Sequence, residues 1–206
     1  MTKNKSNRQW LYSQNKDFYV KKAREFNFRS RAVYKLMEIN QKDDLIKSNY
    51  CVVDLGSSPG SWSQYLSSII KSKGKIIAID LLPMESIKHV THITGDFTDK
   101  SVLKKCLRHT GNNGADLVIS DMAPNLTGIK TTDQSRNLAQ AELVLVFCTQ
   151  TLKADGNLLI KLFEGEGIKA FRELLKQKFD KVLVRKPSAS RDKSREFYIL
   201  ARSFRL

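Results

Sequence analysis

The chain has 206 residues, enough for one α/β domain with a sizeable core or for a domain plus a terminal extension. It has no run of about 18 apolar residues, and its N-terminus, MTKNKSNRQW, lacks the apolar stretch of a signal peptide, so we expect a cytoplasmic protein with no membrane partner. The three cysteines are far apart, and the three histidines come without a CxxC pair, so we expect neither a disulfide framework nor a metal site.

The net charge of +15 is unevenly placed along the chain. Residues 1–47 carry 12 Lys/Arg against 5 Asp/Glu, and residues 161–206 carry 13 against 6, a net +7 in each case. Residues 48–160 carry 11 against 10. Basic ends around a near-neutral centre indicate that the flanks hold a polyanion, although a general charge bias is the alternative. Charge alone does not separate RNA from DNA or from an acidic membrane surface.

Residues 1–47 are predicted to form a basic N-terminal extension with short helices, ahead of a single domain over 48–206. A weak helical pattern covers residues 16–26, and Ser30 is the predicted N-cap of a helix that runs to about Ile39. Aromatic side chains, Trp10 and Tyr12 among them, alternate with Lys and Arg across residues 8–34. They could stack on nucleic-acid bases or pack the extension onto the core, and the sequence favours neither.

From Tyr50 onward the chain alternates between strand and helix patterns. We expect helices at about 61–71, 99–109, 133–153 and 167–178, and strands at about 50–55, 75–80, 89–93, 115–121, 157–163, 180–185 and 196–202. The last two strands are joined only by a loop and should therefore pair antiparallel. The pattern predicts an α/β fold, with a mostly parallel seven-stranded sheet, an antiparallel final strand and helices on both faces.

The first strand and its turn, YCVVDLGSSPGSW over 50–62, have the pattern of a ligand-binding loop. Asp54 interrupts an apolar run, where a carboxylate is costly to bury without a partner. Gly56 and Gly60 allow a backbone that a Cβ would hinder. Ser58 is a plausible N-cap for the next helix, with Pro59 in its first turn. We expect this loop to let a ligand approach backbone N–H groups at the N-terminus of the next helix.

Acidic residues at three successive strand ends indicate that the ligand contains a nucleoside. In open α/β sheets, ligands bind at the carboxyl ends of the strands, where Asp54, Asp80 and Asp96 fall. Asp80 could accept hydrogen bonds from ribose hydroxyls, and Phe97 offers an aromatic face to a purine. The dinucleotide pattern GxGxxG and the P-loop pattern are both absent. The turn instead resembles the first motif of S-adenosylmethionine-dependent methyltransferases, which implies S-adenosylmethionine as the cofactor.

Three further residues could carry chemistry at the same edge. Asp121 follows the fourth predicted strand, and Lys161 interrupts the apolar fifth strand, NLLIKLF. A lysine in a strand that is buried on both faces is costly unless it is paired, which makes Lys161 a candidate base; the alternative is a lysine that reaches the sheet edge and has no chemical role. Glu196 starts an antiparallel strand and so should reach this edge too, although it could be an ordinary edge-strand carboxylate.

With these residues in place, the chain resembles the FtsJ family of RNA ribose 2′-O-methyltransferases from about Trp10 to its end. The motifs that carry the resemblance are RSRAVYKL (29–36), VVDLGSSPGSWSQ (52–64), DLLPM (80–84), GDF (95–97), SDMAPN (120–125), KLFEGEG (161–167) and RKPSASRDKSREFY (185–198). One departure is visible, because the family loop commonly reads DLGAAPGGW and serines stand here at 57, 58 and 61. Ser61 would be strained if its backbone required a positive φ.

The resemblance implies a Rossmann-like methyltransferase fold and a set of site residues. The catalytic tetrad would be Lys35, Asp121, Lys161 and Glu196. The cofactor contacts that it implies are Gly60, Trp62, Asp80, Asp96 and Asp121, and the cofactor-binding set that we expect adds Asp54, Gly56 and Phe97 from the strand ends and the turn.

The resemblance also implies a reaction and a substrate. A ribose 2′-hydroxyl would attack the methyl group without a metal, with Lys161 orienting or deprotonating it. The expected substrate is a uridine of large-subunit (23S) ribosomal RNA in the assembled 50S particle, and we expect a monomer. Relatives in the family that act on transfer RNA provide one alternative, and a non-catalytic RNA-binding ribosome-assembly factor is another.

Overall fold

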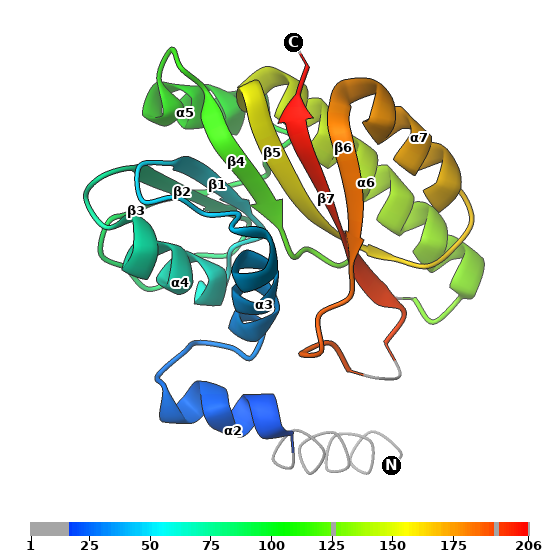
Figure 1. Ribbon diagram of the computed structural model, residues 1–206, viewed down its shortest axis with the longest axis horizontal. Coiled ribbons are helices and arrows are strands. Elements are labelled where there is room, and N and C mark those ends of the chain that lie inside the picture. The colour runs from blue at the N-terminus through cyan, green and yellow to red at the C-terminus, as the bar shows by residue number, and fades with distance from the viewer. Residues whose placement is uncertain (1–16, 125–126, 192–193, 206) are drawn as a thin grey trace.

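A seven-stranded sheet forms the centre of the computed structural model, which describes residues 17–124, 127–191 and 194–205. Its strands are β1 (Cys51–Leu55), β2 (Lys75–Asp80), β3 (Val90–Thr94), β4 (Ala115–Ser120), β5 (Leu152–Phe163), β6 (Phe179–Arg185) and β7 (Glu196–Phe204). The helices in the described residues are α2 (Phe18–Glu25), α3 (Val33–Asp43), α4 (Ser61–Ile70), α5 (Lys100–Thr110), α6 (Lys130–Thr151) and α7 (Ile168–Lys178). Figure 1 shows their arrangement.

The spatial order of the strands is β3-β2-β1-β4-β5-β7-β6. The pairs among β1 to β5 are parallel, and β7 is antiparallel to both of its neighbours, β5 and β6. The chain moves outward from β1 to β3 and then returns to β4 on the other side of β1. This reversal leaves a crevice at the carboxyl ends of β1 and β4. The predicted mostly parallel sheet with an antiparallel final strand is confirmed.

Helices cover both faces of the sheet, as expected. Alternate residues of each strand point to opposite faces, so Val52 and Val53 of β1 belong to different cores. One core joins the sheet to α3 and α4 through Leu36, Ile39, Trp62, Leu66 and Ile70. The other joins it to α5, α6 and α7 (α6 lies behind the sheet in Figure 1). In the parts of the chain that are described, none of the helices is both long enough and apolar enough to cross a membrane.

Helix α3 does not begin where the sequence indicates, and the prediction of Ser30 as its N-cap is wrong. The helix starts at Val33 with Ala32 at the N-cap and no side-chain capping bond. The Ser30 hydroxyl instead accepts a hydrogen bond from the Ala32 N–H (3.3 Å) and donates one to the Ser61 hydroxyl (2.8 Å). Ser30 therefore closes a turn ahead of the helix and links it to α4.

The aromatic residues between 18 and 34 divide into two groups. Tyr19, Phe28 and Tyr34 pack together between α2 and α3, with ring centroids 5.4 and 6.1 Å apart. Phe18 and Phe26 are 66% and 58% exposed. Packing thus explains the first group, whereas Phe18 touches Tyr19 only edge-on (5.4 Å) and both rings of the second group remain mostly exposed. Trp10 and Tyr12 lie outside the described residues.

Candidate active site

The turn after β1 is held by hydrogen bonds within the protein. The N–H groups of Gly56 and Ser57 donate to the Ile79 carbonyl (2.9 and 3.3 Å), and the Ser58 N–H donates to the Asp80 carboxylate (2.9 Å). These three N–H groups of the turn are therefore already paired within the protein, and the expectation of a ligand at the N–H groups of the helix N-terminus stays a prediction. The prediction of Ser58 as the N-cap is also wrong, because its N–H folds back onto Asp80 and α4 begins only at Ser61, after Gly60.

Positive φ angles in this turn occur at glycine, at Gly56 (72°) and Gly60 (105°), and not at Ser61. Ser61 is the first residue of α4 and therefore carries no such strain. A Cβ on Gly60 would lie 2.8 Å from Arg29 Nη1 and 2.9 Å from Ile87 Cδ1. Gly60 thus makes room for Arg29, which donates to the carbonyls of Pro59 and Glu85 (2.9 Å each).

A cavity of about 1050 Å³ lies at the carboxyl ends of β1, β2, β3 and β4. Five of the predicted cofactor-binding residues line it: Gly56, Asp80, Asp96, Phe97 and Asp121. A smaller cavity of about 130 Å³ adjoins it at Gly56, Ser58 and Asp121, and Asp54 and Trp62 line this one. Gly60 lines neither cavity. The structure therefore brings seven of the eight predicted residues to two adjoining cavities.

The cavity lining suits a nucleoside-sized group. A Cβ on Gly56 would lie 2.0 Å from Met122 Cγ, so glycine is needed here for the Met122 side chain to pack against the turn. The Ser57 hydroxyl, which lines the smaller cavity, is buried and has no hydrogen-bond partner among the described residues. The Phe97 ring is fixed edge-on against Phe147 at 5.9 Å while it lines the large cavity. Carboxylates, an aromatic ring and an unpartnered hydroxyl are groups that an adenosine and an amino-acid moiety can use.

Trp62 and Asp54 flank the turn, and each forms a hydrogen bond within the protein. Trp62 Nε1 donates to the Ala32 carbonyl (2.8 Å), and the Ser63 hydroxyl donates to Asp54 (2.7 Å). The Asp54 side chain is buried, and burial raises its pKa to about 7 despite this hydrogen bond. A carboxyl group with this pKa is partly protonated near neutral pH.

The four residues of the expected tetrad form two ion pairs. Lys161 Nζ lies 3.0 Å from Asp121 Oδ1 and also donates to the Asp121 carbonyl, while Lys35 Nζ lies 2.7 Å from Glu196 Oε1. Lys35, Lys161 and Glu196 are each 9% exposed or less. Burial by itself would raise the pKa of Glu196, but Lys35 and the charge of Lys161 outweigh it, so the pKa lies below its usual range. Lys161 is thus a buried, paired lysine and does not extend into solvent.

Tyr198 connects the two ion pairs, and the sequence reasoning missed it. Its hydroxyl donates to Asp121 Oδ1 (2.6 Å), and Lys35 Nζ lies over its ring, 5.9 Å from the centroid. Burial and the Asp121 carboxylate raise the pKa of Tyr198 well above its usual value, so the hydroxyl remains a donor. The signal was present, because Tyr198 pairs with Lys161 in the β5–β7 register and lies two residues after Glu196, on the same face.

A third cavity, of about 430 Å³, opens beside Lys35 and Glu196. It is also lined by Arg31 and Arg191, and burial together with the charge of Arg191 lowers the pKa of Arg31. The loop that carries Arg191 is anchored to α3, because Glu38 accepts hydrogen bonds from the Ser188 N–H (2.9 Å) and hydroxyl (2.8 Å). Two guanidinium groups and a lysine thus border one opening.

No group of three or more His, Cys, Asp or Glu side chains that could hold a metal ion occurs among the described residues. The expectation of a reaction without a metal stays a prediction.

The sequence profile of FtsJ-like methyltransferases matches residues 28–204. The chain belongs to this family. Its members include proteins named ribosomal RNA large subunit methyltransferase E, such as those of Pseudomonas aeruginosa PAO1 (46% identity) and Pseudomonas fluorescens Pf-5 (47%). Each alignment spans 205 residues, 100% of this chain and 99% or 98% of the relative. The predicted family and its methyltransferase class are confirmed.

Solved structures agree with membership in the FtsJ-like family. A ribosomal RNA methyltransferase from Plasmodium falciparum superposes with a TM-score of 0.79 at 29% identity, and the match covers 86% of this chain and 98% of the other. Fibrillarin from Aeropyrum pernix, solved with natively bound S-adenosyl-L-methionine, gives a TM-score of 0.56 at 16% identity over 84% and 74% of the two chains. The second match shows the shared Rossmann-like fold alone.

Proposed function

We propose that this protein transfers a methyl group from S-adenosylmethionine to a ribose 2′-hydroxyl of large-subunit ribosomal RNA. The single observation that carries this proposal is the buried Lys161–Asp121 pair, in which Asp121 also lines the large cavity. It places a cationic side chain next to a nucleoside-sized cavity at the topological switch point. The names of the relatives support ribosomal RNA as the substrate class. At finer detail we propose a uridine of 23S ribosomal RNA in the assembled 50S particle, methylated by a monomer in the cytoplasm.

The cofactor would occupy the large cavity and extend toward the smaller one. Asp80 and Asp96 would accept hydrogen bonds from its hydroxyl or amino groups, and the Phe97 ring would lie against its base. When bound, S-adenosylmethionine would supply a methyl group on a positively charged sulfur, and the S–CH₃ bond breaks as an oxygen nucleophile takes the methyl group, leaving a neutral thioether. The part of the site in the smaller cavity would come from Gly56, Trp62 and the Asp54 carboxyl. Gly60 would act indirectly, by admitting Arg29 beside the turn.

Lys161 would orient the 2′-hydroxyl and stabilise the negative charge that develops on its oxygen as the hydroxyl proton passes to solvent. Two of its N–H groups are used by the Asp121 carboxylate and carbonyl, which leaves the third to donate to the ribose oxygen. Asp121 would hold the lysine, and Tyr198 would hold Asp121. Positioning of this kind is a large part of catalysis when the nucleophile is a weak one.

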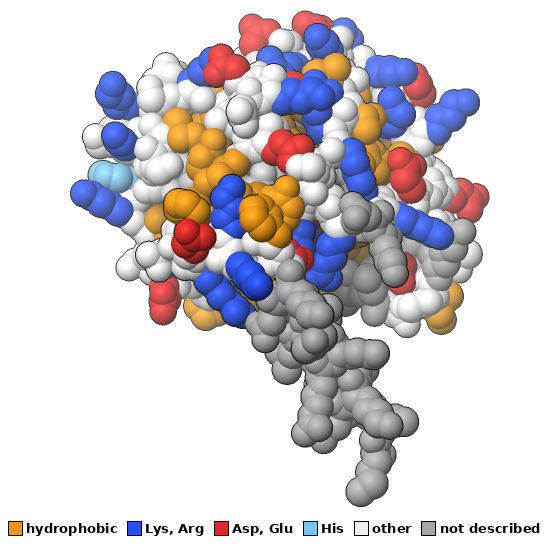
Figure 2. Space-filling view, turned by 60° about the horizontal axis from the view of Figure 1, so that its bottom comes forward, with side chains coloured by type: hydrophobic (Ala, Val, Ile, Leu, Met, Phe, Trp, Pro, Cys, Tyr) orange, Lys and Arg blue, Asp and Glu red, His pale blue; other side chains and the backbone are white. Residues whose placement is uncertain are grey.

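Lys35 and Glu196 would fix the target ribose from the other side. They border the 430 Å³ cavity together with Arg31 and Arg191, whose guanidinium groups suit phosphate oxygens. Figure 2 looks onto this end of the molecule, where Lys and Arg side chains (blue) lie among apolar ones (orange), with a few acidic ones (red) between them. A surface of this kind suits an RNA strand with unstacked bases.

The substrate class can be tested with radiolabelled S-adenosylmethionine and separated RNAs. We expect label in isolated large-subunit particles or in their 23S RNA. Label in transfer RNA instead would overturn the ribosomal substrate and favour the first alternative. No label in any RNA, from a protein that binds RNA, would favour a non-catalytic assembly factor.

The role of Lys161 can be tested on the same substrate. Lys161→Ala should lower kcat by at least about a hundredfold, while binding of the cofactor, measured by calorimetry, stays within about twofold. Lys153→Ala is a matched control, since Lys153 lies on the same strand but is exposed and pairs with Asp116. Transfer by the Lys161 variant near the wild-type rate would remove this residue from the mechanism.

A further inference from the structure

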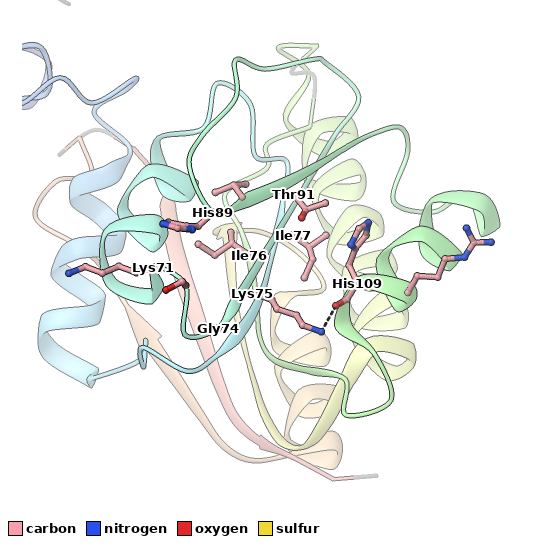
Figure 3. A pocket seen from close by; sticks show the side chains of 11 residues that line it. Lys71, Gly74, Lys75, Ile76, Ile77, His89, Thr91 and His109 are labelled. Atoms are coloured by element: carbon pink, nitrogen blue, oxygen red, sulfur yellow. Dashed lines mark hydrogen bonds between the residues drawn. The ribbon is translucent and has the colours of Figure 1, made fainter.

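A second basic hollow lies at the end of the sheet opposite the candidate active site. It has a volume of about 490 Å³ and is built around the amino ends of β2 and β3, between the end of α4 and the end of α5 (Figure 3). Because β2 has 6 residues at about 3.3 Å each, roughly 20 Å separates this end from the cofactor cavity. The hollow therefore belongs to a different surface.

The side chains around this hollow carry positive charge on both sides. Lys71, Lys75 and Arg108 line it together with His89 and His109, and none of its lining residues, all of which are described, is acidic. Lys75 Nζ donates to the His109 carbonyl (2.9 Å) and points toward α5, whereas Lys71 extends away from α5 beside α4 (Figure 3). Positive groups therefore flank the hollow in two directions and do not converge on one point.

The middle of the chain is near neutral in total, but the acidic side chains of residues 71–110 lie away from this hollow. Residues 71–110 contain 8 Lys/Arg and 4 Asp/Glu. All four acids are placed elsewhere: Asp80 and Asp96 line the cofactor cavity, Glu85 lies 3.8 Å from Arg29, and Asp99 is at the N-cap of α5. Further along α5, Lys104 and Lys105 are exposed ahead of Arg108. The amino end of this part of the sheet is thus left strongly basic.

We propose that this hollow is a second docking site for RNA, which contacts the phosphodiester backbone at a distance from the methylated nucleotide. This docking proposal rests on the proposed function, because the RNA that binds the hollow would be the RNA that is methylated. The hollow is open and its cations are spread along the edge, which fits successive phosphates better than one small anion. RNA that reaches both ends must extend roughly 20 Å beyond the target ribose, so the protein would favour a large folded RNA over a short strand.

The test uses the double variant Lys71→Glu/Arg108→Glu. Lys71 and Arg108 are both exposed. We expect the KM for large-subunit particles to rise about tenfold with kcat unchanged, and the slope of log Kd against log salt to fall by about 2. The control is Lys178→Glu/Lys181→Glu, which makes the same charge change at exposed positions beside β6, the strand at the opposite edge of the sheet from β3. Equal effects of the two double variants, or no effect of the first, would overturn the proposal.

The binding measurement keeps this proposal separate from the proposed function. If the wild-type protein transfers no methyl group but the first double variant selectively lowers the salt slope of particle binding, the proposed function fails and the docking site stands. If transfer occurs and the slope does not change, the docking site fails alone.

Discussion

One carboxylate oxygen of Asp121 forms an ion pair with Lys161 (3.0 Å) and accepts a hydrogen bond from Tyr198 (2.6 Å). Two donors at one oxygen fix the rotation of the carboxylate, and through it the position of the lysine ammonium group. The Tyr198 ring is itself immobilised, because it is fully buried and lies 6.0 Å from the Trp62 ring. A residue that lines neither of the two cofactor cavities can therefore control the geometry of the proposed catalytic lysine.

Tyr198→Phe should lower kcat for methyl transfer by roughly tenfold, equivalent to about 1.4 kcal/mol, with little change in KM. The ring remains in place, so only the donor to Asp121 is lost. Steady-state kinetics on large-subunit particles would measure the split between kcat and KM. The control is Tyr65→Phe, which removes a hydroxyl that accepts from Asn40 (3.0 Å) outside the site. An unchanged kcat in the Tyr198 variant would show that the lysine is positioned without it.

The raised pKa of Asp54 has a consequence for stability. Burial raises it from 3.8 to about 7, so the folded protein keeps a proton that the unfolded chain has already lost over that interval. The free energy of unfolding must therefore fall as the pH rises from about 4 toward 7 and level off above it. This sign is opposite to that of Glu196, whose pKa is lowered by its lysine partners.

Asp54→Asn should remove this pH dependence, because an amide can accept from Ser63 without ionising. Between about pH 5 and pH 7.5 the wild type should lose on the order of 2 kcal/mol more stability than the variant, as measured by urea unfolding. Asp180→Asn changes an exposed carboxylate and should leave the wild-type slope intact. Parallel pH curves for wild type and the Asp54 variant would contradict the assignment.

At the scale of elements, α2 presents aromatic rings in two directions. Tyr19 packs inward against Tyr34, while the exposed Phe18 ring lies 5.8 Å from Lys22 Nζ. Phe26, just after the helix, is exposed as well. Exposed rings beside cations can stack on unpaired bases while the cations bind phosphates.

Phe18→Ala/Phe26→Ala should therefore weaken binding to large-subunit particles by about tenfold or more, since base stacking contributes roughly 1–3 kcal/mol per ring. The free energy of unfolding should change by less than about 1 kcal/mol, because neither ring is buried. The matched control is Phe28→Ala, which removes a ring that packs on Tyr34 and should act on stability instead. Filter binding and urea unfolding separate the two effects, and unchanged binding in the double variant would leave these rings without a role in RNA recognition.

The alternation of apolar patterns located every strand and helix from β1 to β7, because sheet burial on two faces imposes a regular pattern on the sequence. The local signals at helix starts failed, since Ser30 and Ser58 both look like N-caps. Each serine is used instead by a tertiary partner, Ser61 for the first and Asp80 for the second. Strand β5 also starts five residues before the expected position, at Leu152, where it pairs with Ala115 across a bulge.

Part of the site could be predicted because a charged residue interrupts the apolar pattern of a buried strand. A lysine in an apolar strand is conspicuous in sequence, so Lys161 was found, and strand direction placed Glu196 beside it. Tyr198 is unremarkable as an aromatic in a strand, and only the β5–β7 register reveals its position against Lys161. The role of Gly60 in making room for Arg29 could not be predicted either, because Arg29 comes from a distant segment of the chain.

At the scale of the whole molecule, charge and chemistry are divided between the two ends of the sheet. The carboxyl ends carry the cofactor cavity, the two ion pairs and the opening bordered by Arg31 and Arg191. The amino ends of β2 and β3 carry a basic hollow without acidic lining. A folded RNA that contacts both ends would bind the basic hollow through its backbone and place its target ribose at the carboxyl ends of the strands.

The central claim is methyl transfer to a ribose 2′-oxygen, and the position of the transferred methyl group tests it most directly. Large-subunit RNA labelled by the protein would be hydrolysed with alkali, which needs a free 2′-hydroxyl to cleave the adjacent phosphodiester. We predict that the label stays in an alkali-resistant dinucleotide and is absent from reactions with Lys161→Ala. Label released in mononucleotides would place the methyl group on a base and contradict the account.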